Sequence, residues 1–599
     1  MTRTLATLLI LSALAPVGAA VAQQEPADLI LTGGKVITLD PLAPEVQALA
    51  IADGIVIATG TNDEVIGSRD DDTRVIELGG RTVIPGLNDS HSHMVRGGRF
   101  YTTELRWDGV GSLARGLEMI AEQARRTPEG QWVRVIGGWS PFQFEEARMP
   151  TPAELTEASP DVPVFVLYLY SRGFLNAAAV AELGIDETTE VPPRTRYEFT
   201  DDGGAILHAE PDPGLLYQTI GALPGLSEAD QENSTRHFYR ELARFGLTSA
   251  VDAGGGGHVF PGDYVGTRRL ADAGEMPIRI SNYLFPQTPG EELADFETWT
   301  DGWAVNVNLA DRLAHGFVVE GGGEFLVWSA GDFENWLADA PDITTREGWR
   351  EQLTAVTRRL LARRWPIRIH ATYDESVGHI MDVFEEAHRL EREAGRSGFD
   401  GVRWAIEHAE TVTRENLERI AALGGGVAIQ ARMAYAGEYS VERDGAEAAA
   451  DAPPIRDMIE LGIPVGAGTD ATRVASYNPW EALEWLVTGE TVGGLATRDE
   501  RNRLSRMEAL ALYTVGSAWF SGEEAIKGRI APGQFADLAV LTDDYADVAE
   551  DAIGDIESVL TIVGGNVTYG AEEFEGLAPA LPAIRPEWSP VAAFGGYAR

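Results

Sequence analysis

The sequence predicts an α/β protein, a (β/α)8 TIM-like barrel with a small β-sandwich built from both chain ends. Residues 27–84 alternate apolar and polar positions between glycine turns, and the same texture returns at residues 523–575. Such alternation is typical of short antiparallel strands. Between these ends, short β-branched runs alternate with helical stretches, which indicates βα units around a parallel sheet. We therefore expect a composite sandwich, a barrel over residues 85–522 and a tail over residues 576–599.

The last barrel units can be placed individually. We expect four strands, at residues 365–372, 403–408, 425–431 and 463–470. A helix that ends at about residue 396 is expected to follow the first of them. The spacing from His370 to His408 is close to one βα unit, and the spacing from His408 to Asp470 holds two. Between residues 100 and 315 the rhythm is less regular, and the strands there cannot be numbered.

The first 22 residues are typical of a secretory signal peptide. Arg3 supplies a positive charge, an apolar run follows, and the small residues Ala20-Val21-Ala22 precede Gln23,. The alternative is a membrane anchor, but Pro16 breaks the apolar run, which is shorter than the roughly 20 residues that a spanning helix needs. We expect cleavage before Gln23 and export to the periplasm or the medium.

The composition excludes several classes of partner and chemistry. The formal charge is −45 and the pI is near 4.5, which argues against binding to nucleic acid or to an anionic membrane surface. The chain has no cysteine, so disulfides and thiolate ligands are excluded. The expected partner is a small-molecule substrate. A homodimer is allowed for, and the number of subunits stays open.

Four of the ten histidines lie where predicted strands end. His91 and His93 are two residues apart on one strand end, so both can face the same side and hold one ion. His370 and His408 each close a separate strand, and Asp470 closes the last. Because the C-terminal ends of barrel strands converge on the face that carries active sites, we expect these five side chains to surround a metal. For each residue alone, the alternative is a structural histidine or a helix-capping aspartate.

Five segments carry a resemblance to a known family. They are VIPG at 83–86 leading to DSHSH at 89–93, HATYD at 370–374, EHA at 407–409, GTD at 468–470 and GRIAPGQFADL at 528–538. Together they resemble the metal-dependent amidohydrolase superfamily, and within it the amidohydrolase 3 or YtcJ-like branch. The resemblance covers nearly the whole mature chain, and it is uninformative about the substrate.

The resemblance implies a set of metal ligands. It assigns His91, His93 and Asp470 to one metal position. It assigns His370 and His408 to a second position, or to substrate and water contacts in a single-metal enzyme. The implied cofactor is a divalent metal, in one or two copies, with zinc as the default for such nitrogen-rich sites.

Catalytic roles follow from the same resemblance. Asp470 is expected to take a proton from the attacking water and pass it to the leaving nitrogen. His370 or His408 is expected to stabilise the developing oxyanion. Glu407 and Asp374 are expected to orient the imidazoles from behind, and the alternative for both is a salt bridge at a strand or loop edge.

One departure from the family concerns the ligand that often bridges two metals, a carboxylated lysine on the fourth strand. Both lysines of this chain, Lys35 and Lys527, fall in the sandwich segments. The segment AHGFVVEGGGEFLVW stands where that strand is expected, and its Glu320 and Glu324 have the spacing of the branch's usual motif. We predict Glu320 as a metal ligand, with Glu324 left open. The alternatives are a single-metal site and a glycine-rich loop whose acidic side chains are solvated.

The predicted function is metal-dependent hydrolysis of a non-peptide C–N bond, an amide of a small molecule, by metal-activated water. The alternatives are an ester, lactone or carbamate hydrolase with the same site, and a catalytically inactive exported binding protein. The complete set of five ligands disfavours the inactive protein. Serine hydrolysis has little support because no Gly-x-Ser-x-Gly elbow stands beside a triad. The glycine runs at 254–257 and 321–323 lack the ending of a phosphate loop.

Overall fold

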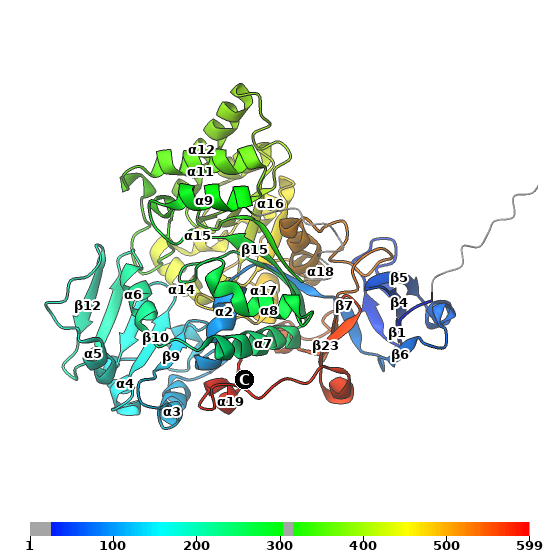
Figure 1. Cartoon of the computed structure of the whole chain (residues 1–599), viewed down its shortest axis with the longest axis horizontal. Helices are drawn as coiled ribbons and strands as arrows, with labels where there is room; N and C mark the ends of the chain where they lie inside the picture. Colours follow the sequence, from blue (N-terminus) through cyan, green and yellow to red (C-terminus); the bar gives the residue numbers. More distant parts are fainter. Residues whose placement is uncertain (1–25, 303–315, 598–599) are drawn as a thin grey trace, which may run out of the picture.

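The computed structural model describes residues 26–302 and 316–597, so the predicted signal peptide lies outside the described residues. At its centre, eight parallel strands form one curled sheet (Figure 1). In sheet order they are β20 (Val465–Gly468), β19 (Gly426–Gln430), β18 (Trp404–His408), β17 (Ile367–Ala371), β16 (Phe317–Gly322), β15 (Arg279–Leu284), β14 (Leu247–Asp252) and β8 (Leu87–Ser92). The first and last strands meet where the Asp470 amide donates to the His91 carbonyl oxygen at 2.9 Å. The predicted (β/α)8 barrel is confirmed.

The last barrel units lie where the sequence predicts them, with β17 to β20 inside the four expected ranges. Helix α12 (Asp374–Glu393) follows β17 and buries Val377, Ile380 and Phe384, a spacing that places them on one face. The other helices of this part are α2 (Met94–Phe100), α7 (Glu228–Arg244), α8 (Val265–Asp272), α9 (Glu292–Gly302), α11 (Trp349–Arg363), α13 (Arg414–Ala422), α14 (Arg432–Asp444), α15 (Ala446–Ala450), α16 (Ile455–Glu460), α17 (Pro479–Thr488) and α18 (Arg506–Ala511). Within residues 26–302 and 316–597, no helix combines the length and apolarity needed to cross a membrane.

The two ends of the chain share a β-structure beside the barrel (Figure 1, right). One sheet has the order β5 (Ile55–Gly60), β4 (Ala48–Ala52), β1 (Leu29–Thr32) and β6 (Arg74–Glu77), with α1 (Asn62–Val65) after β5. The other has the order β23 (Asn566–Gly570), β22 (Ser558–Val563), β21 (Leu538–Leu541), β7 (Thr82–Pro85), β2 (Lys35–Ile37) and β3 (Glu45–Val46). Leu31 and Leu49 from the first sheet share a buried core with Val83 and Leu538 from the second. The antiparallel pairing of β21 with β7 joins the two ends of the chain within the second sheet. A bridge between Ile55 and Phe535 also links the C-terminal part to β5 of the first sheet.

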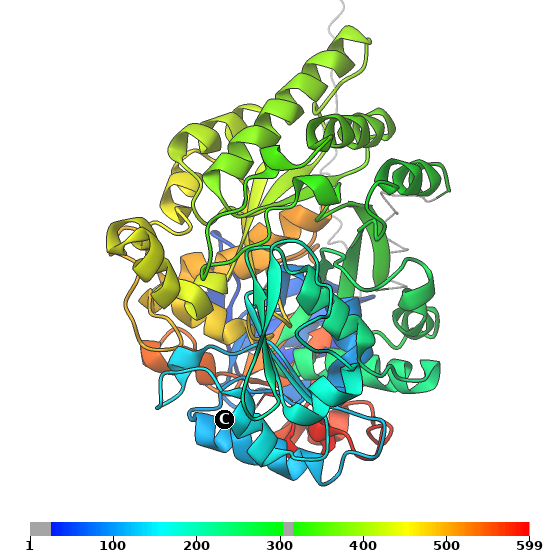
Figure 2. The same cartoon turned by 90° about the vertical axis from the view of Figure 1, so that its left-hand side faces the viewer.

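A further sheet is inserted between the first two barrel strands, β8 and β14. Its order is β12 (Thr195–Phe199), β13 (Ala205–Ala209), β11 (Arg172–Leu175), β10 (Val164–Tyr168) and β9 (Val133–Ile136). With α3 (Leu113–Ala124), α4 (Pro152–Ala158), α5 (Ala177–Leu183) and α6 (Gly214–Ala222) it forms the inserted unit, residues 113–222. It lies across the barrel from the sandwich in Figure 1 and faces the viewer in Figure 2. Because this sheet is mostly antiparallel, it interrupts the βα rhythm that the sequence shows elsewhere.

The C-terminal segment packs along the barrel rather than extending away from it. The Asn233 side chain of α7 donates to the Ala583 carbonyl oxygen at 3.0 Å. Near the end of the chain, after α19 (Pro590–Phe594), Tyr597 donates its hydroxyl to Glu481 of α17 at 2.5 Å.

Candidate metal centre

Five predicted site residues meet at the C-terminal mouth of the barrel. His91 lies in β8 and His93 follows it, His370 lies in β17, His408 ends β18, and Asp470 follows β20. His93 Nε2 lies 3.1 Å and His91 Nε2 lies 3.5 Å from Asp470 Oδ1. His370 Nδ1 lies 2.8 Å from His408 Nε2. All five side chains are buried, so segments far apart in the sequence form one compact cluster.

Glu324 lies in the middle of this cluster. Its Oε2 is 3.0 Å from His370 Nδ1 and 3.3 Å from His408 Nε2. Its Oε1 is 3.6 Å from His93 Nε2. Three groups have donor atoms within 4.8 Å of one another: His91 with His93 and Glu324, His91 with His408 and Asp470, and Glu324 with His370 and His408. Because His91, Glu324 and His408 each belong to two of these groups, the cluster could hold one ion or two.

The prediction of Glu320 as a metal ligand needs correction, because Glu324 occupies the cluster instead. Glu320 belongs to β16, whereas Glu324 follows its end, where its amide donates to the Ala253 carbonyl oxygen at 2.8 Å. Four residues of strand correspond to about 13 Å, so the two carboxylates lie at different depths of the barrel. Glu320 lines a cavity at the opposite mouth and belongs to none of the donor groups found among the described residues.

Three of the imidazoles are held through their Nδ1 atoms. His91 Nδ1 lies 2.6 Å from Glu407 Oε2, His93 Nδ1 lies 2.8 Å from the Gly254 carbonyl oxygen, and His408 Nδ1 lies 2.6 Å from Gln430 Oε1. Contacts of this kind fix the ring orientation and leave Nε2 available to a metal.

The two residues predicted to orient imidazoles differ in position. Glu407 contacts His91 and also pairs with the buried Arg368. Among the described residues, Asp374 contacts no imidazole: its carboxylate accepts hydrogen bonds from the Thr413 amide at 2.7 Å and from Asn416 Nδ2 at 2.8 Å. Asp374 therefore links the beginnings of α12 and α13, and its expected role beside the metal is wrong.

The electrostatics of the cluster favour ionised carboxylates. Burial raises the pKa of Asp470 and of Glu324, but the neighbouring histidines outweigh burial and hold both pKa values well below the usual range. Burial also opposes charge on His91, yet Glu407 and Asp470 together raise the pKa of His91 to about 10. The cluster therefore requires positive charge, which either imidazole protons or a cation can supply.

The donor set fits a divalent cation. It offers imidazole nitrogens and carboxylate oxygens, the donors that zinc and similar ions accept. His91 Nε2 is buried and has no hydrogen-bond partner among the described residues, as expected of an atom whose partner is a metal ion. Metal binding displaces protons from imidazoles. A bound cation can therefore replace those protons as the positive charge beside the carboxylates.

Charged residues around the cluster were not found from the sequence. Arg432 Nε donates to Glu410 Oε1 at 2.7 Å, and Arg432 Nη1 lies 3.1 Å from Glu334 Oε2. Asp332 Oδ1 lies 3.2 Å from His370 Nε2. Arg432 and Glu410 each follow the end of a barrel strand by two residues. This position could have identified them as candidate site residues from the sequence. Asp332 and Glu334 lie in a loop with no such signal.

A small cavity opens onto the cluster, and the inserted unit forms one of its walls. Its lining includes His93, Glu324, His370, Asp470, Arg96, Tyr170 and Tyr217. The rings of Tyr170 and Tyr217, both from the inserted unit, stack with centroids 5.4 Å apart. Tyr217, Gly256 and Phe333 also line an outer cavity of about 680 Å³. The small inner space and the larger, partly aromatic outer space are therefore neighbours that share part of their walls.

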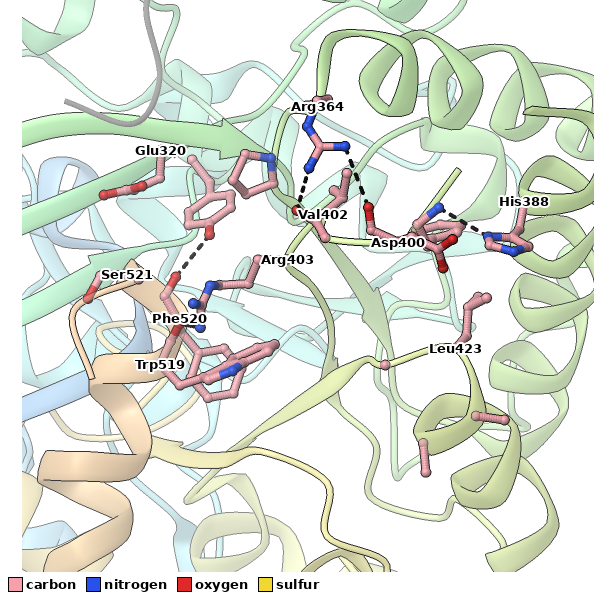
Figure 3. A pocket seen from close by; sticks show the side chains of 18 of the residues that line it. Glu320, Arg364, His388, Asp400, Val402, Arg403, Leu423, Trp519, Phe520 and Ser521 are labelled. Carbon is pink, nitrogen blue, oxygen red and sulfur yellow. Dashed lines mark hydrogen bonds between the residues drawn. The ribbon is translucent and has the colours of Figure 1, made fainter. Parts of the chain in front are cut away.

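A second large cavity lies at the N-terminal mouth of the barrel, with a volume of about 1040 Å³. Pro366, Arg403 and Gly424, which line it, lie just before or shortly before β17, β18 and β19. Figure 3 shows Glu320 on one wall and Arg364 hydrogen-bonded to the chain near Asp400 on another. None of the donor groups identified among the described residues lies here.

Comparison with known proteins places the chain in a family. A model of the amidohydrolase family matches residues 74–569. The chain is 26% identical to an N-substituted formamide deformylase of Arthrobacter pascens over 90% of its own length and 98% of the relative. It is 24% identical to the putative amidohydrolase YtcJ of Bacillus subtilis, again over 90% and 98%.

Solved structures agree in fold. An uncharacterised metal-dependent hydrolase from Pyrococcus horikoshii superposes with a TM-score of 0.61 at 20% identity, covering 87% of this chain and 99% of that one. Its counterpart from Pyrococcus furiosus gives 0.60 at 21% identity, covering 87% of this chain and 100% of that one. With the family match spanning most of the sequence, this chain belongs to the amidohydrolase family and is a metal-dependent hydrolase of carbon–nitrogen bonds other than peptide bonds.

Proposed function

We propose that the cluster holds zinc and that the enzyme hydrolyses an amide, such as an N-substituted formamide, of a small molecule. The observation that carries this proposal is the convergence of four histidines, Asp470 and Glu324 on one buried point beside a cavity. The nitrogen-rich donor set supports zinc over calcium or magnesium. The formamide deformylase, similar over most of both chains, supports the type of bond.

Asp470 is the proposed proton carrier. Its carboxylate borders the inner cavity and is held ionised by neighbouring histidines. An ionised carboxylate at this position accepts the proton of the attacking water and returns it to the leaving nitrogen. When bound, a divalent cation supplies Lewis acidity toward a carbonyl oxygen and acidifies water.

His370 is the better placed of the two histidines predicted to stabilise the oxyanion, because it lines the cavity whereas His408 lies behind it. Asp332 and Glu324 contact its two ring nitrogens at 3.2 and 3.0 Å and fix the ring. With both nitrogens engaged, the ring would stabilise the oxyanion through its positive charge rather than through a free N–H. A ring fixed in advance needs no reorganisation when charge develops on the substrate.

Elemental analysis of the purified protein combined with a hydrolysis panel tests the proposal. The panel pairs an N-formyl amine, an N-acyl amine and a cyclic amide with an ester and a lactone of matched size. We expect one or two zinc ions per chain and turnover of at least one amide. A metal-loaded protein that cleaves only the ester or the lactone, or cleaves nothing, would overturn the assignment.

We also propose that the chain is exported, on the strength of its first 22 residues. Expression with the native start in a bacterial host, followed by N-terminal sequencing of the periplasmic fraction, is expected to return Gln23 as the first residue. Retention of Met1 in the cytoplasm would contradict export.

A further inference from the structure

Arg96 places a buried positive charge on the wall of the inner cavity. It lies in α2, three residues after His93, and only 4% of the residue is exposed. The cavity that it lines also contains Asp470 and Glu324 from the cluster and the stacked Tyr170 and Tyr217 from the inserted unit. A group bound beside the proposed scissile bond would therefore lie next to the Arg96 guanidinium.

Among the described residues, Arg96 differs from the buried Arg368 and Arg432 because it forms no close ion pair. Arg368 pairs with Glu407, and Arg432 pairs with Glu410 and Glu334. Within the parts of the chain that the structure describes, Arg96 makes one hydrogen bond, from Nη1 to the Tyr170 hydroxyl at 3.4 Å, and its Nε has no partner. Asp470 and Glu324 attract it only from a longer distance.

A second arginine adds to the positive charge at this wall. Arg473 is 5% exposed, its Nη1 has no hydrogen-bond partner among the described residues, and its guanidinium lies 5.8 Å from the centre of the Tyr217 ring. Two buried guanidinium groups therefore approach the Tyr170–Tyr217 pair, and neither has a close carboxylate partner in residues 26–302 and 316–597. Removing a charged group from water without a partner is unfavourable, so such an arrangement is typical of a site completed by a ligand.

The glycine run at 254–257 allows Arg96 to approach the cluster. Gly255 has a φ of +121°, and a side chain built on it would come within 2.8 Å of His93 Nδ1 and 3.0 Å of Arg96 Nη1. Only glycine tolerates both that backbone angle and that contact. The run, which has no phosphate-loop motif, thus brings backbone, metal ligand and arginine together.

We propose that the substrate carries a carboxylate close to its scissile amide and that Arg96 binds this carboxylate. The proposal rests on the proposed amide hydrolysis. The remainder of the substrate extends past Tyr217 and Phe333 into the outer cavity, where Trp328 adds an apolar wall. A substrate with an apolar side chain next to its carboxylate would suit this arrangement, with the carboxylate in the inner cavity and the side chain in the outer one.

Two formamides that differ only in the carboxylate test this specificity. N-formyl-L-phenylalanine has the carboxylate, and N-formyl-2-phenylethylamine lacks it. We expect the zinc-loaded enzyme to prefer the first in kcat/KM by about tenfold or more, the range of a charge-assisted hydrogen bond. In Arg96→Met the preference is expected to disappear, mainly through a higher KM, and in Arg96→Lys part of it is expected to remain.

A control variant and a binding measurement separate this inference from the hydrolase assignment. Arg99→Met removes a cation one turn further along α2 that already pairs with Asp263, and it is expected to leave the preference unchanged. Calorimetry compares 3-phenylpropanoate with the neutral 3-phenylpropanamide on the zinc-loaded protein. We expect the carboxylate to bind about tenfold more tightly, and Arg96→Met to abolish the difference.

The outcomes are distinguishable. If neither formamide is hydrolysed but the carboxylate preference in calorimetry depends on Arg96, the proposed reaction fails and the anion site stands. If the preference survives in correctly folded Arg96→Met, the carboxylate binds elsewhere, for example at the metal, and the inference is wrong. Equal affinity of the wild-type protein for both compounds would also overturn it.

Discussion

The two mouths of the barrel differ in cavity size and in the metal-donor side chains that they bring together. The N-terminal mouth has the larger cavity, about 1040 Å³, with Glu320 on its wall. The C-terminal mouth has a smaller buried space, but Glu324, four histidines and Asp470 there form three overlapping groups whose donor atoms lie within 4.8 Å of one another. Glu320 and Glu324 are four residues apart on one segment. The position of a donor along the barrel axis, rather than cavity size, therefore decides where metal chemistry can occur.

Metal removal is the strongest way to test this contrast. Dialysis against a chelator is expected to reduce hydrolysis to background and to lower the melting temperature, because the folded protein loses a ligand that unfolded chains bind poorly. Zinc added back is expected to restore both quantities. Activity that persists after elemental analysis shows no metal would place the chemistry outside the cluster.

Substitution of Asp470 is expected to have the next largest effect. Asp470→Asn keeps the size of the side chain but removes the proton acceptor, and kcat is expected to fall about 10³-fold or more, since acid–base groups contribute roughly 10²–10⁴-fold. Circular dichroism should show an intact fold. A loss of less than about tenfold would assign the proton transfer to another residue.

The pair Glu324→Gln and Glu320→Gln compares the two mouths directly. Both changes neutralise a buried carboxylate on the same segment. Glu324→Gln is expected to reduce bound metal and to lower kcat/KM by about 100-fold, because a ligand is worth at least as much as its supporting contacts. Glu320→Gln is expected to change kcat/KM by less than about threefold. The reverse order would restore the sequence-based assignment of Glu320.

A smaller loss than that of Glu324→Gln is expected from a residue that acts through His91. Glu407→Gln weakens the contact that orients the ring, and the metal affinity is expected to fall about 10–100-fold in a chelator competition. Asp374→Asn is the matched control, because Asp374 binds Thr413 and Asn416 instead of an imidazole. Equal losses in the two variants would mean that Glu407 acts on stability alone.

The barrel could be predicted where each unit repeats one pattern. The strands that end near His370, His408 and Asp470 were expected within two residues of their observed bounds. The inserted unit could not be predicted, because its antiparallel sheet breaks the βα alternation and has its own core around Phe165 and Leu207. Hydrophobic patterns predict strands, but they do not predict which sheet a strand joins.

The site could be predicted where a residue type and a strand end coincide. That rule led to the four histidines and Asp470, which the structure brings together. It could not separate Glu320 from Glu324, because the glycine-rich segment leaves the end of the strand undefined by pattern. Arg96 was missed for another reason: its surroundings come from the inserted unit and from the glycine run after β14, which only the fold brings near.

The pairing of β7 with β21 has a consequence for biosynthesis. The sheet that β2, β3 and β7 begin cannot be completed until almost the entire polypeptide has been made. Until then, the edge of β7 presents unpaired backbone groups, which favour association with other nascent chains. A nonsense mutation before residue 538 would leave that edge permanently uncovered, so truncated forms are expected to aggregate even when every metal ligand has been translated.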